Sequence, residues 1–326
     1  MKLRSGSRLE RVLAAGHFAV TVEVGPPQGP NPEVIRRKAE WLRGVADAYN
    51  VTDNQTAVVR LSSIAGAKLL LEAGLEPVMQ TTCRDRNRIA LQSDLLGASA
   101  LGIKNCLCLS GDHQKASASG KLKGHPGAKN VYDVDSIQLL AILQGMRDQA
   151  VQASGDPLEQ PAPFFIGAAW TPLATPESFR TLRLAKKIEA GADFIQTQAV
   201  FDVARFAAAV KKAREMGLCD RVAILAGIVV PRSARMLRYL NERVPGVEVP
   251  EELIRRMEAA TQPAAEGKRI AKELIEAVRV IPGVRGVHLQ AIENEAVLPE
   301  IIQSADLLPR PELNAEPARA ASIRNR

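Results

Sequence analysis

Cysteine, histidine and aromatic residues are scarce in this chain of 326 residues. Its four cysteines are too few for a disulfide framework, and none lies at zinc-ligand spacing from another cysteine or a histidine. We therefore expect a reduced, cytoplasmic protein without a metal site. Cys106 and Cys108 fall on the same face of an apolar run. This placement favours core packing over metal or redox chemistry, because free cysteine is commonly buried.

Signatures of nucleic-acid binding, nucleotide binding and membrane insertion are also missing. With two Trp, three Tyr and seven Phe, no stretch interleaves aromatic with basic residues as single-strand binding requires. The chain contains neither GxGxxG nor GxxxxGK[ST]. The longest uncharged window, 160–176, is broken by four prolines, and His17 and Glu23 interrupt the N-terminal apolar stretch, so we expect neither a membrane span nor a signal peptide. The net charge of +7 therefore favours small anionic partners over nucleic acid.

Short apolar runs rich in β-forming residues alternate with helical patterns along the chain. Most successive runs begin about 29 residues apart, the length of one βα unit. Eight such units predict a single (β/α)8 barrel over 1–308, and the segment 309–326, rich in Pro, Ala and Arg, predicts a disordered tail. We expect 115–129, rich in Lys, Gly and Ser, to form a flexible loop above the fourth strand. The predicted strands are 18–24, 46–52, 75–82, 104–110, 164–170, 193–198, 221–228 and 285–290, and the predicted helices are 31–43, 63–73, 86–101, 133–150, 176–190 and 203–216.

Polar residues gather at the C-terminal ends of the predicted strands, where active sites of such barrels lie. Alternation in the first strand places Glu23 on the same face as Ala19 and Thr21, pointing into the barrel mouth. Removal from water favours the neutral form of a carboxyl, which suits a general acid near pH 7. The alternative is a buried glutamate paired with an arginine, which is less favoured because no basic residue falls at a neighbouring strand end. The same alternation gives three further polar pairs: Gln80 with Thr82, Gln196 with Gln198, and His288 with Gln290.

Asp112 follows the fourth strand, directly after Gly111. Glycine there allows the backbone to approach a ligand closely, so Asp112 is a candidate functional carboxylate. A plain turn aspartate explains the same pattern equally well. The adjacent His113 is a weak candidate for a metal or triad residue, because no serine lies in a nucleophile elbow.

Taken together and in order, these strand-end segments resemble the methylenetetrahydrofolate reductase family, which consists of flavin-dependent (β/α)8 barrels. The resemblance covers about residues 18–305. The segment VEVGPP around Glu23 resembles the first-strand Glu and Pro-Pro of the family, and LSGD, ending in Asp112, resembles its Arg-Gly-Asp turn. Five further segments match in order: VT at 51–52, TTC at 81–83, KIEAGAD at 187–193, QTQAVFD at 196–202 and AGI at 226–228.

The resemblance implies reduction of 5,10-methylenetetrahydrofolate to 5-methyltetrahydrofolate by a flavin. By analogy, Glu23 protonates N10 of the folate and opens its five-membered ring, Asp112 lies between flavin and pterin, and Gln198 hydrogen-bonds the folate. The implied flavin is FAD, with FMN as the alternative, and a basic mouth fits its phosphates and the folate glutamate. The implied flavin contacts are Thr52, Gln80, Thr82, Ser110, Gly111, Asp112, Tyr132, Ala168, Trp170 and Lys187.

Several family positions are altered here. Gln80 and Ser110 replace a histidine and an arginine, and WTPLATPE at 170–177 replaces a Tyr-Pro-Glu-x-His-Pro-Glu stretch. Ala234 stands near the aromatic lid that stacks on nicotinamide in NAD(P)H-dependent members, and Asn294 near a late arginine. The sequence therefore resembles members from acetogenic bacteria, whose flavin is reduced through a partner subunit, and we expect an oligomer or a complex.

Two other functions stay open at this stage. One is a flavin-free pterin-binding barrel that transfers a methyl group to a corrinoid protein, which predicts a mouth rich in Asn and Asp. The other is the folate and flavin subunit of a larger electron-transfer complex, inactive by itself. The identity of the electron donor separates the second from an independent reductase.

Overall fold

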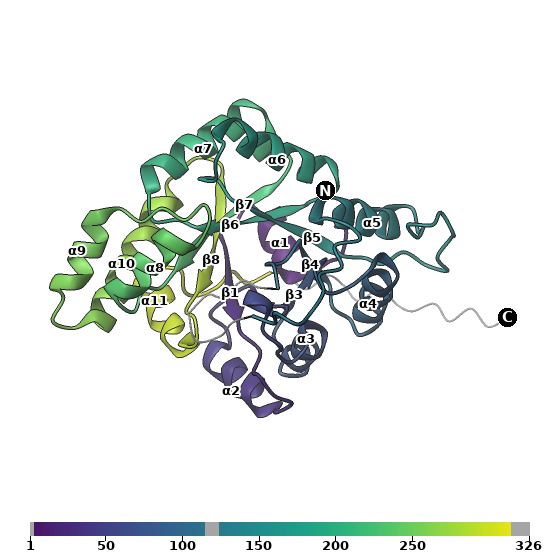
Figure 1. The fold of residues 1–326 in the computed structure, drawn as a ribbon, viewed down its shortest axis with the longest axis horizontal. Helices are drawn as coiled ribbons and strands as arrows, with labels where there is room; N and C mark the ends of the chain where they lie inside the picture. The colour runs from purple at the N-terminus through teal and green to yellow at the C-terminus, as the bar shows by residue number, and fades with distance from the viewer. Residues whose placement is uncertain (1–2, 115–123, 314–326) are drawn as a thin grey trace.

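A computed structural model describes residues 3–114 and 124–313. Eight parallel strands close into a barrel in the order β1 to β8, and helices surround it (Figure 1). The predicted single (β/α)8 barrel is confirmed, and each of the eight predicted strands is present. Their bounds are β1 (Ala19–Val24), β2 (Ala48–Val51), β3 (Pro77–Thr82), β4 (Asn105–Leu109), β5 (Phe165–Trp170), β6 (Phe194–Ala199), β7 (Ala223–Val229) and β8 (Val284–Gln290).

The helices that the sequence predicts are confirmed within a few residues at their ends. They are α2 (Glu33–Leu42), α3 (Ser63–Glu72), α4 (Arg88–Ala100), α5 (Ser136–Asp148), α6 (Glu177–Glu189) and α7 (Val203–Glu215). Five more were not predicted: α1 (Arg8–Ala14), α8 (Ala234–Arg243), α9 (Glu251–Ala259), α10 (Pro263–Arg279) and α11 (Leu298–Ser304). Short 3₁₀ turns complete the described chain: η1 (Gln55–Ala57), η2 (Leu218–Asp220) and η3 (Glu295–Val297).

The N-terminal end of the barrel is filled by apolar side chains. Leu9 and Val12 of α1 pack beneath a lumen layer that includes Phe165 and Phe194. The two phenylalanine rings are stacked, with centroids 5.1 Å apart. Because this end is plugged, a ligand can reach the lumen only from the C-terminal ends of the strands.

Asp47 fastens the chain ends to this plugged face. Its side chain is fully buried, accepts a hydrogen bond from the backbone N–H of Val20 at 2.8 Å, and pairs with Arg8 and Arg310. Arg310 also donates to the carbonyl of Phe18 at 2.7 Å. Residues 309–313 of the segment predicted to be a tail are therefore described and held under the barrel, and 314–326 lie outside the described residues.

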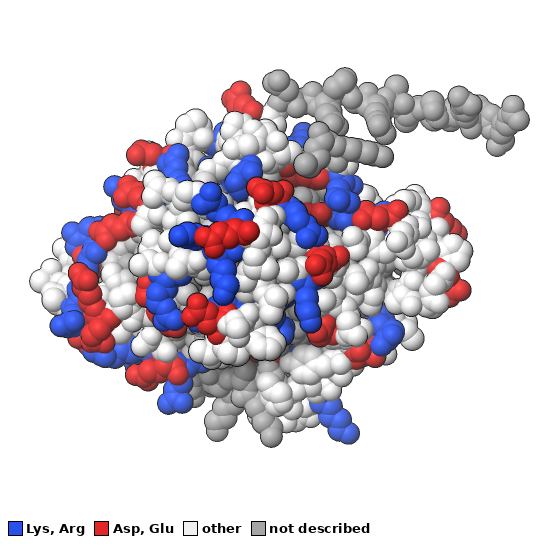
Figure 2. Space-filling model, turned by 90° about the horizontal axis from the view of Figure 1, so that it is seen from above, with Lys and Arg blue, Asp and Glu red and all other residues white. Residues whose placement is uncertain are grey.

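The predicted core role of the thiols is confirmed. Cys106 and Cys108 have no exposed surface and lie in the hydrophobic layer between the strands and the helices. At the surface, Figure 2 shows acidic and basic side chains interspersed over the face that it displays, without a field of one sign. Among the described residues, no helix is long and apolar enough to cross a membrane.

Candidate active site at the barrel mouth

Glu23 lies near the end of β1 and faces the lumen, as the alternation predicted. One of its carboxylate oxygens, Oε2, accepts a hydrogen bond from Nε2 of Gln290 at 3.2 Å. The same oxygen lies 4.0 Å from Nε2 of His288, which is on the neighbouring strand β8. The Glu23 side chain keeps 19% of its surface exposed, so it is open to the mouth.

The surroundings of Glu23 favour its protonated form. Burial, reinforced by the nearby carboxylate of Glu295, raises the pKa of Glu23 to about 7, against the opposing effects of Gln290, Lys38 and Arg60. Lys38 and Arg60 lie on α2 and in the loop after β2, so a search of strand ends does not find them. Among the described residues, no arginine or lysine lies within 4.0 Å of the Glu23 carboxylate. A carboxyl with this pKa can hold and release a proton near neutral pH.

A chain of buried polar groups crosses the lumen below Glu23. Asn50 and Gln196 form a reciprocal amide pair, with N···O distances of 2.7 and 3.0 Å. Nε2 of Gln196 also donates to the Thr21 hydroxyl at 3.1 Å, and this hydroxyl lies 3.0 Å from Nδ1 of His288. All four side chains are at most 3% exposed. Below the mouth, the lumen is therefore a satisfied polar layer that ends at the imidazole facing Glu23.

Asp112 lies at the rim after β4 and is held by the loop that follows β2. Its Oδ2 accepts a hydrogen bond from the backbone N–H of Thr56 at 3.0 Å. In that loop Asn54, Thr56 and Ala57 all have positive φ values, between 46° and 57°, a conformation unfavourable for residues other than glycine. A strained loop therefore presents a backbone donor to the carboxylate.

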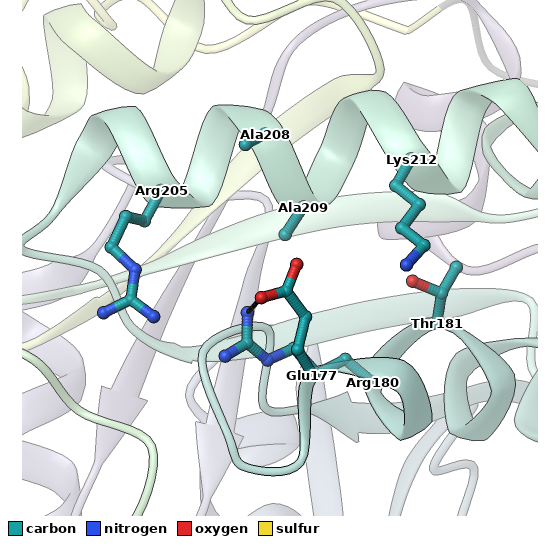
Figure 3. Close-up of a pocket in the computed structure, with 7 residues that line it drawn as sticks. All are labelled: Glu177, Arg180, Thr181, Arg205, Ala208, Ala209 and Lys212. Carbon is teal, nitrogen blue, oxygen red and sulfur yellow. Dashed lines mark ion pairs between the residues drawn. The ribbon is translucent and has the colours of Figure 1, made fainter.

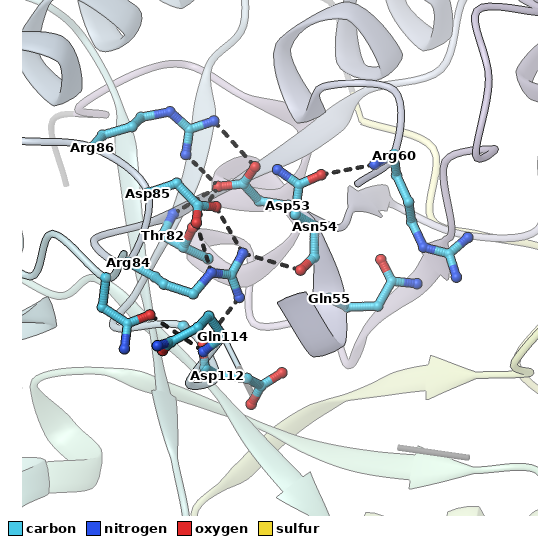
Figure 4. Close-up of polar contacts among 12 residues, drawn as sticks. Asp53, Asn54, Gln55, Arg60, Thr82, Arg84, Asp85, Arg86, Asp112 and Gln114 are labelled. Carbon is cyan, nitrogen blue, oxygen red and sulfur yellow. Dashed lines mark hydrogen bonds and ion pairs between the residues drawn. The ribbon is translucent and has the colours of Figure 1, made fainter. Parts of the chain in front are cut away.

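The side chain of Arg84 ties these loops together (Figure 4). It is 2% exposed and donates to the carbonyl of Asp112 at 3.2 Å and to the carbonyl of Asn54 at 3.1 Å. Asp85 neutralises its charge at 2.7 Å. The guanidinium of Arg84 therefore links the ends of three successive βα units. The sequence did not predict a role for Arg84, because backbone carbonyls are present at every residue and do not reveal which of them an arginine will bind.

Neighbouring ion pairs extend this framework. Asp53, fully buried, accepts from the backbone N–H and the hydroxyl of Thr82, both at 2.9 Å, and pairs with Arg86 at 2.7 Å. Arg86 also pairs with Asp94 on α4. The charges that follow β3 are thus largely compensated within the protein.

Gln198 reaches the rim through a bulge in β6. The pairing of β6 with β7 shifts register between Gln196 and Ala199, and Oε1 of Gln198 accepts from the N–H of Ala199 at 3.1 Å. Gly227 makes room for this shift, because a Cβ there would lie 2.3 Å from the carbonyl oxygen of Thr197. A bulge re-aims a side chain next to a site, and glycine is required where the two backbones approach.

The other predicted flavin contacts fall into two groups. The first group surrounds the rim of β2 to β4. Gly111 has a φ of 88°, and a Cβ at this position would lie 3.0 Å from Cβ of Thr82. The turn therefore packs closely against the end of β3. The hydroxyl of Tyr132 donates to the carbonyl of Gly111 at 3.1 Å, and Tyr132 is 38% exposed. Thr52, Gln80, Thr82 and Ser110 lie at or near the same strand ends.

The second group, Ala168, Trp170 and Lys187, does not face the mouth. Ala168 is fully buried, and Trp170 is 3% exposed with its indole N–H donating to the carbonyl of Arg180 at 3.0 Å; both pack in the layer outside the barrel. Nζ of Lys187 donates to the carbonyl of Ala169, and burial lowers the pKa of Lys187 to about 8. The structure thus brings only the β2 to β4 group together.

The rim of β2 to β4 gathers most of the predicted flavin contacts. A close turn at Gly111, a partly exposed tyrosine and an acidic side chain lie together there, and such groups can contact a planar heterocycle. In addition, Nε of Arg60 is buried and has no hydrogen-bond partner among the described residues, and Arg60 acts electrostatically on Glu23.

The described residues also form a cavity away from the barrel mouth. This surface cavity of about 100 Å³ lies between α6 and α7, lined by Arg180, Thr181, Arg205 and Lys212 with Glu177 paired to Arg180 (Figure 3). It is outside the barrel, and none of the strand-end candidates lines it. Within residues 3–114 and 124–313, no cluster of His, Cys, Asp or Glu could hold a metal ion, and the expected absence of a metal site remains a prediction.

Comparison with known proteins agrees with the strand-end pattern. The family model described as methylenetetrahydrofolate reductase matches residues 8–306. The chain belongs to this family. A curated relative from Caenorhabditis elegans, named "Probable methylenetetrahydrofolate reductase (NADPH)", is 24% identical over 317 residues. The match covers 92% of this chain and 44% of that protein, so the chain spans less than half the length of this reductase.

Solved structures show the same fold at low sequence identity. A protein from Clostridium thermocellum, described as binding two copies of 5-methyl-5,6,7,8-tetrahydrofolic acid, superposes with a TM-score of 0.62 at 12% identity, covering 91% of this chain and 97% of that one. The EDTA monooxygenase from Chelativorans sp. BNC1 superposes with a TM-score of 0.53 at 11% identity, covering 89% and 94%. At these identities the likeness concerns the fold alone.

Proposed function

We propose that this member of the methylenetetrahydrofolate reductase family reduces 5,10-methylenetetrahydrofolate to 5-methyltetrahydrofolate in a flavin-dependent reaction. The observation that carries the proposal is Glu23, a carboxyl at the open end of the barrel whose pKa is raised to about 7 by burial. The family membership and the methyltetrahydrofolate bound by the C. thermocellum protein support a folate as substrate.

Glu23 acts as the general acid on the folate. Protonated near neutral pH, it gives its proton to N10, the bond from N10 to the bridging carbon breaks, and an electrophilic iminium remains on N5. Gln290 holds the Glu23 carboxylate through a hydrogen bond to Oε2. Gln198, aimed by the bulge in β6, hydrogen-bonds the pterin.

A flavin bound on the rim of β2 to β4 would supply the hydride. Thr52, Gly111, Asp112 and Tyr132 would hold its ring, with Gln80, Thr82 and Ser110 along the same strand ends. Asp112, oriented by Thr56 and Arg84, places a negative charge beside flavin and folate. Its charge favours the cationic iminium, because opposite charges attract.

The described part of the mouth has few free cations to bind the phosphate part of a flavin. Ser110 is neutral and Lys187 is tied to the carbonyl of Ala169, so neither presents a free cation at the mouth. We propose FAD as the flavin, with FMN, which has a single phosphate, as the alternative. We also propose a partner subunit as electron donor, since Ala234 stands where a stacking aromatic would lie.

The methyl-transfer alternative has less support. A flavin-free pterin site of that kind calls for free Asn and Asp side chains around the ring. Here the amide of Asn50 is bonded to Gln196, and the carboxylate of Asp53 is bonded to Thr82 and Arg86. No specific contact in the described mouth favours a corrinoid partner.

The test is formation of 5-methyltetrahydrofolate by the flavin-reconstituted chain, with a chemically reduced dye as electron donor. Wild type should form the product, and Glu23→Gln should reduce the rate by about 10²-fold or more while the dye still reduces the flavin. Glu40→Gln, at an exposed position on α2, is the matched control and should behave like wild type. Equal folate turnover by Glu23→Gln and wild type would contradict the proposal.

A further inference from the structure

His288 is the point where the buried polar chain of the lumen meets Glu23. Nδ1 of its ring lies 3.0 Å from the Thr21 hydroxyl, and Nε2 lies 4.0 Å from Oε2 of Glu23. The ring is 2% exposed, and burial lowers the pKa of His288 to about 3. The imidazole is therefore neutral at physiological pH, with one nitrogen as donor and the other as acceptor.

The Gln196 amide pairs reciprocally with that of Asn50. Turning both amides over would keep this pair and make the Thr21 hydroxyl donate to Gln196, which again leaves the hydroxyl oxygen to accept from Nδ1–H of His288. In the orientation found, Oε1 of Gln196 accepts from Nδ2 of Asn50, and its Nε2 donates to Oδ1 of Asn50. The second hydrogen of that Nε2 points to Thr21, at 3.1 Å. The hydroxyl oxygen of Thr21 is consequently an acceptor toward Gln196, and its single hydrogen must serve another neighbour.

Two acceptors compete for the hydroxyl hydrogen of Thr21: the carbonyl of Val287 at 3.3 Å and Nδ1 of His288 at 3.0 Å. If the hydrogen goes to the carbonyl, Nδ1–H of His288 donates to the hydroxyl oxygen, and all three contacts are hydrogen bonds. If it goes to Nδ1, the contact with Val287 is not a bond. Because buried polar groups favour complete satisfaction, the first arrangement wins and leaves Nε2 of His288 as a bare acceptor.

We propose that Thr21 locks His288 as its Nδ1–H tautomer, so that the lone pair on Nε2 faces Glu23 and holds the acid in its protonated form. His288 is then a positioning residue for the proton that Glu23 delivers. At 4.0 Å a bare lone pair repels a carboxylate electrostatically and attracts the proton of a carboxylic acid. The inference rests on the proposed function only for its catalytic meaning; the tautomer follows from the contacts alone.

The other groups facing Glu23 do not replace this effect. Glu295, on η3, also disfavours the carboxylate, whereas Lys38 on α2 and Arg60 in the loop after β2 favour it. Gln290 on β8 donates to Oε2 of Glu23. A donor at Nε2 of His288 would favour the Glu23 carboxylate, as Lys38 and Arg60 do, whereas an acceptor there disfavours it. The tautomer therefore decides the direction in which His288 acts.

The tautomer can be read directly by nitrogen NMR of the resting chain labelled with ¹⁵N-histidine. The sequence holds only four histidines, and a His288→Gln sample identifies the signal of interest. We expect the Nδ1–H pattern in wild type, constant from mildly acidic to mildly alkaline pH. The Nε2–H pattern in wild type would overturn the proposal, and this measurement needs neither folate nor flavin.

Two substitutions of Thr21 test the lock and its effect on the acid. Thr21→Ser keeps the hydroxyl and should keep the Nδ1–H pattern. Thr21→Val removes it and should yield the Nε2–H pattern, with proton binding by Glu23 about tenfold weaker in a ¹³C titration of its carboxyl. A role for Thr21 in packing alone predicts the wild-type tautomer and Glu23 titration in both variants, and that outcome would refute the lock.

The outcomes separate this inference from the proposed function. If the chain is inactive but shows the Nδ1–H pattern, and Thr21→Val changes that pattern, the lock is supported and the reductase function is refuted. An active chain with the Nε2–H pattern retains the reductase and removes the lock.

Discussion

Replacing Glu23 by glutamine should change how the stability of the protein depends on pH. In the folded chain the pKa of this carboxyl is raised to about 7, against 4.5 for the unperturbed group. Between these values the folded state binds more protons than the unfolded state, so the folded state loses stability as pH rises. The free energy of this effect is about 3 kcal/mol, from about 1.4 kcal/mol for each tenfold change in proton affinity.

Titration of His288 changes the stability of the protein with pH in the opposite direction. Its pKa is lowered to about 3 from 6.5, so the unfolded state binds the extra proton and stability rises with pH across that interval. In wild type the contributions of Glu23 and His288 nearly cancel between pH 4.5 and 6.5. In Glu23→Gln only the contribution of His288 remains, so the stability of the variant should increase as pH rises from 4.5 to 6.5.

The assay is urea unfolding of both proteins, followed by circular dichroism at several pH values from 4.5 to 8. We expect the variant to gain about 3 kcal/mol relative to wild type over that range. The exposed Glu40→Gln on α2 is the control and should stay within about 0.5 kcal/mol of wild type throughout. A difference between Glu23→Gln and wild type that does not vary with pH would refute the reasoning, because Glu23 would then be ionised at neutral pH.

Three further predictions follow from single contacts. Arg84→Met should lower folate turnover by about 10²-fold in a steady-state assay, since Asp112 loses the guanidinium that holds its carbonyl; unchanged turnover would exclude this role. Gly227→Ala should destabilise the fold by about 1–3 kcal/mol in urea unfolding, because its Cβ would meet the carbonyl of Thr197 at 2.3 Å. Asp47→Ala should cost about 3–5 kcal/mol in the same assay and leave kcat of the surviving folded protein unchanged, because Asp47 lies at the plugged end; a loss of kcat alone would place it in the site.

The barrel could be predicted from the sequence because buried parallel strands are near-continuous apolar runs at a regular interval. The plug was not predictable in the same way. Helix α1, at seven residues, is too short to show a periodic pattern, and its role depends on packing against Phe165 and Phe194. Arg310 was assigned to a tail because its partner Asp47 is 263 residues away.

At the site, alternation correctly placed Glu23 in the lumen, since the period of a strand is two. The same period assigns Ala168 and Trp170 to the outer face of the barrel, where they lie in the structure. Their assignment as flavin contacts came from the resemblance to the family and not from this alternation. Arg84 could not be predicted as part of the site, because it acts on the backbone carbonyls of Asn54 and Asp112. Such contacts depend on the tertiary structure alone.

The most direct test of the central claim is a single-turnover reaction between the chain carrying reduced flavin and 5,10-methylenetetrahydrofolate without oxygen. The account predicts that the absorbance of oxidised flavin returns as one equivalent of 5-methyltetrahydrofolate forms, and that Glu23→Gln, with flavin still bound, slows this step by about 10²-fold or more. A chain that binds no flavin after reconstitution, or a bound reduced flavin that the folate leaves unchanged, would contradict it.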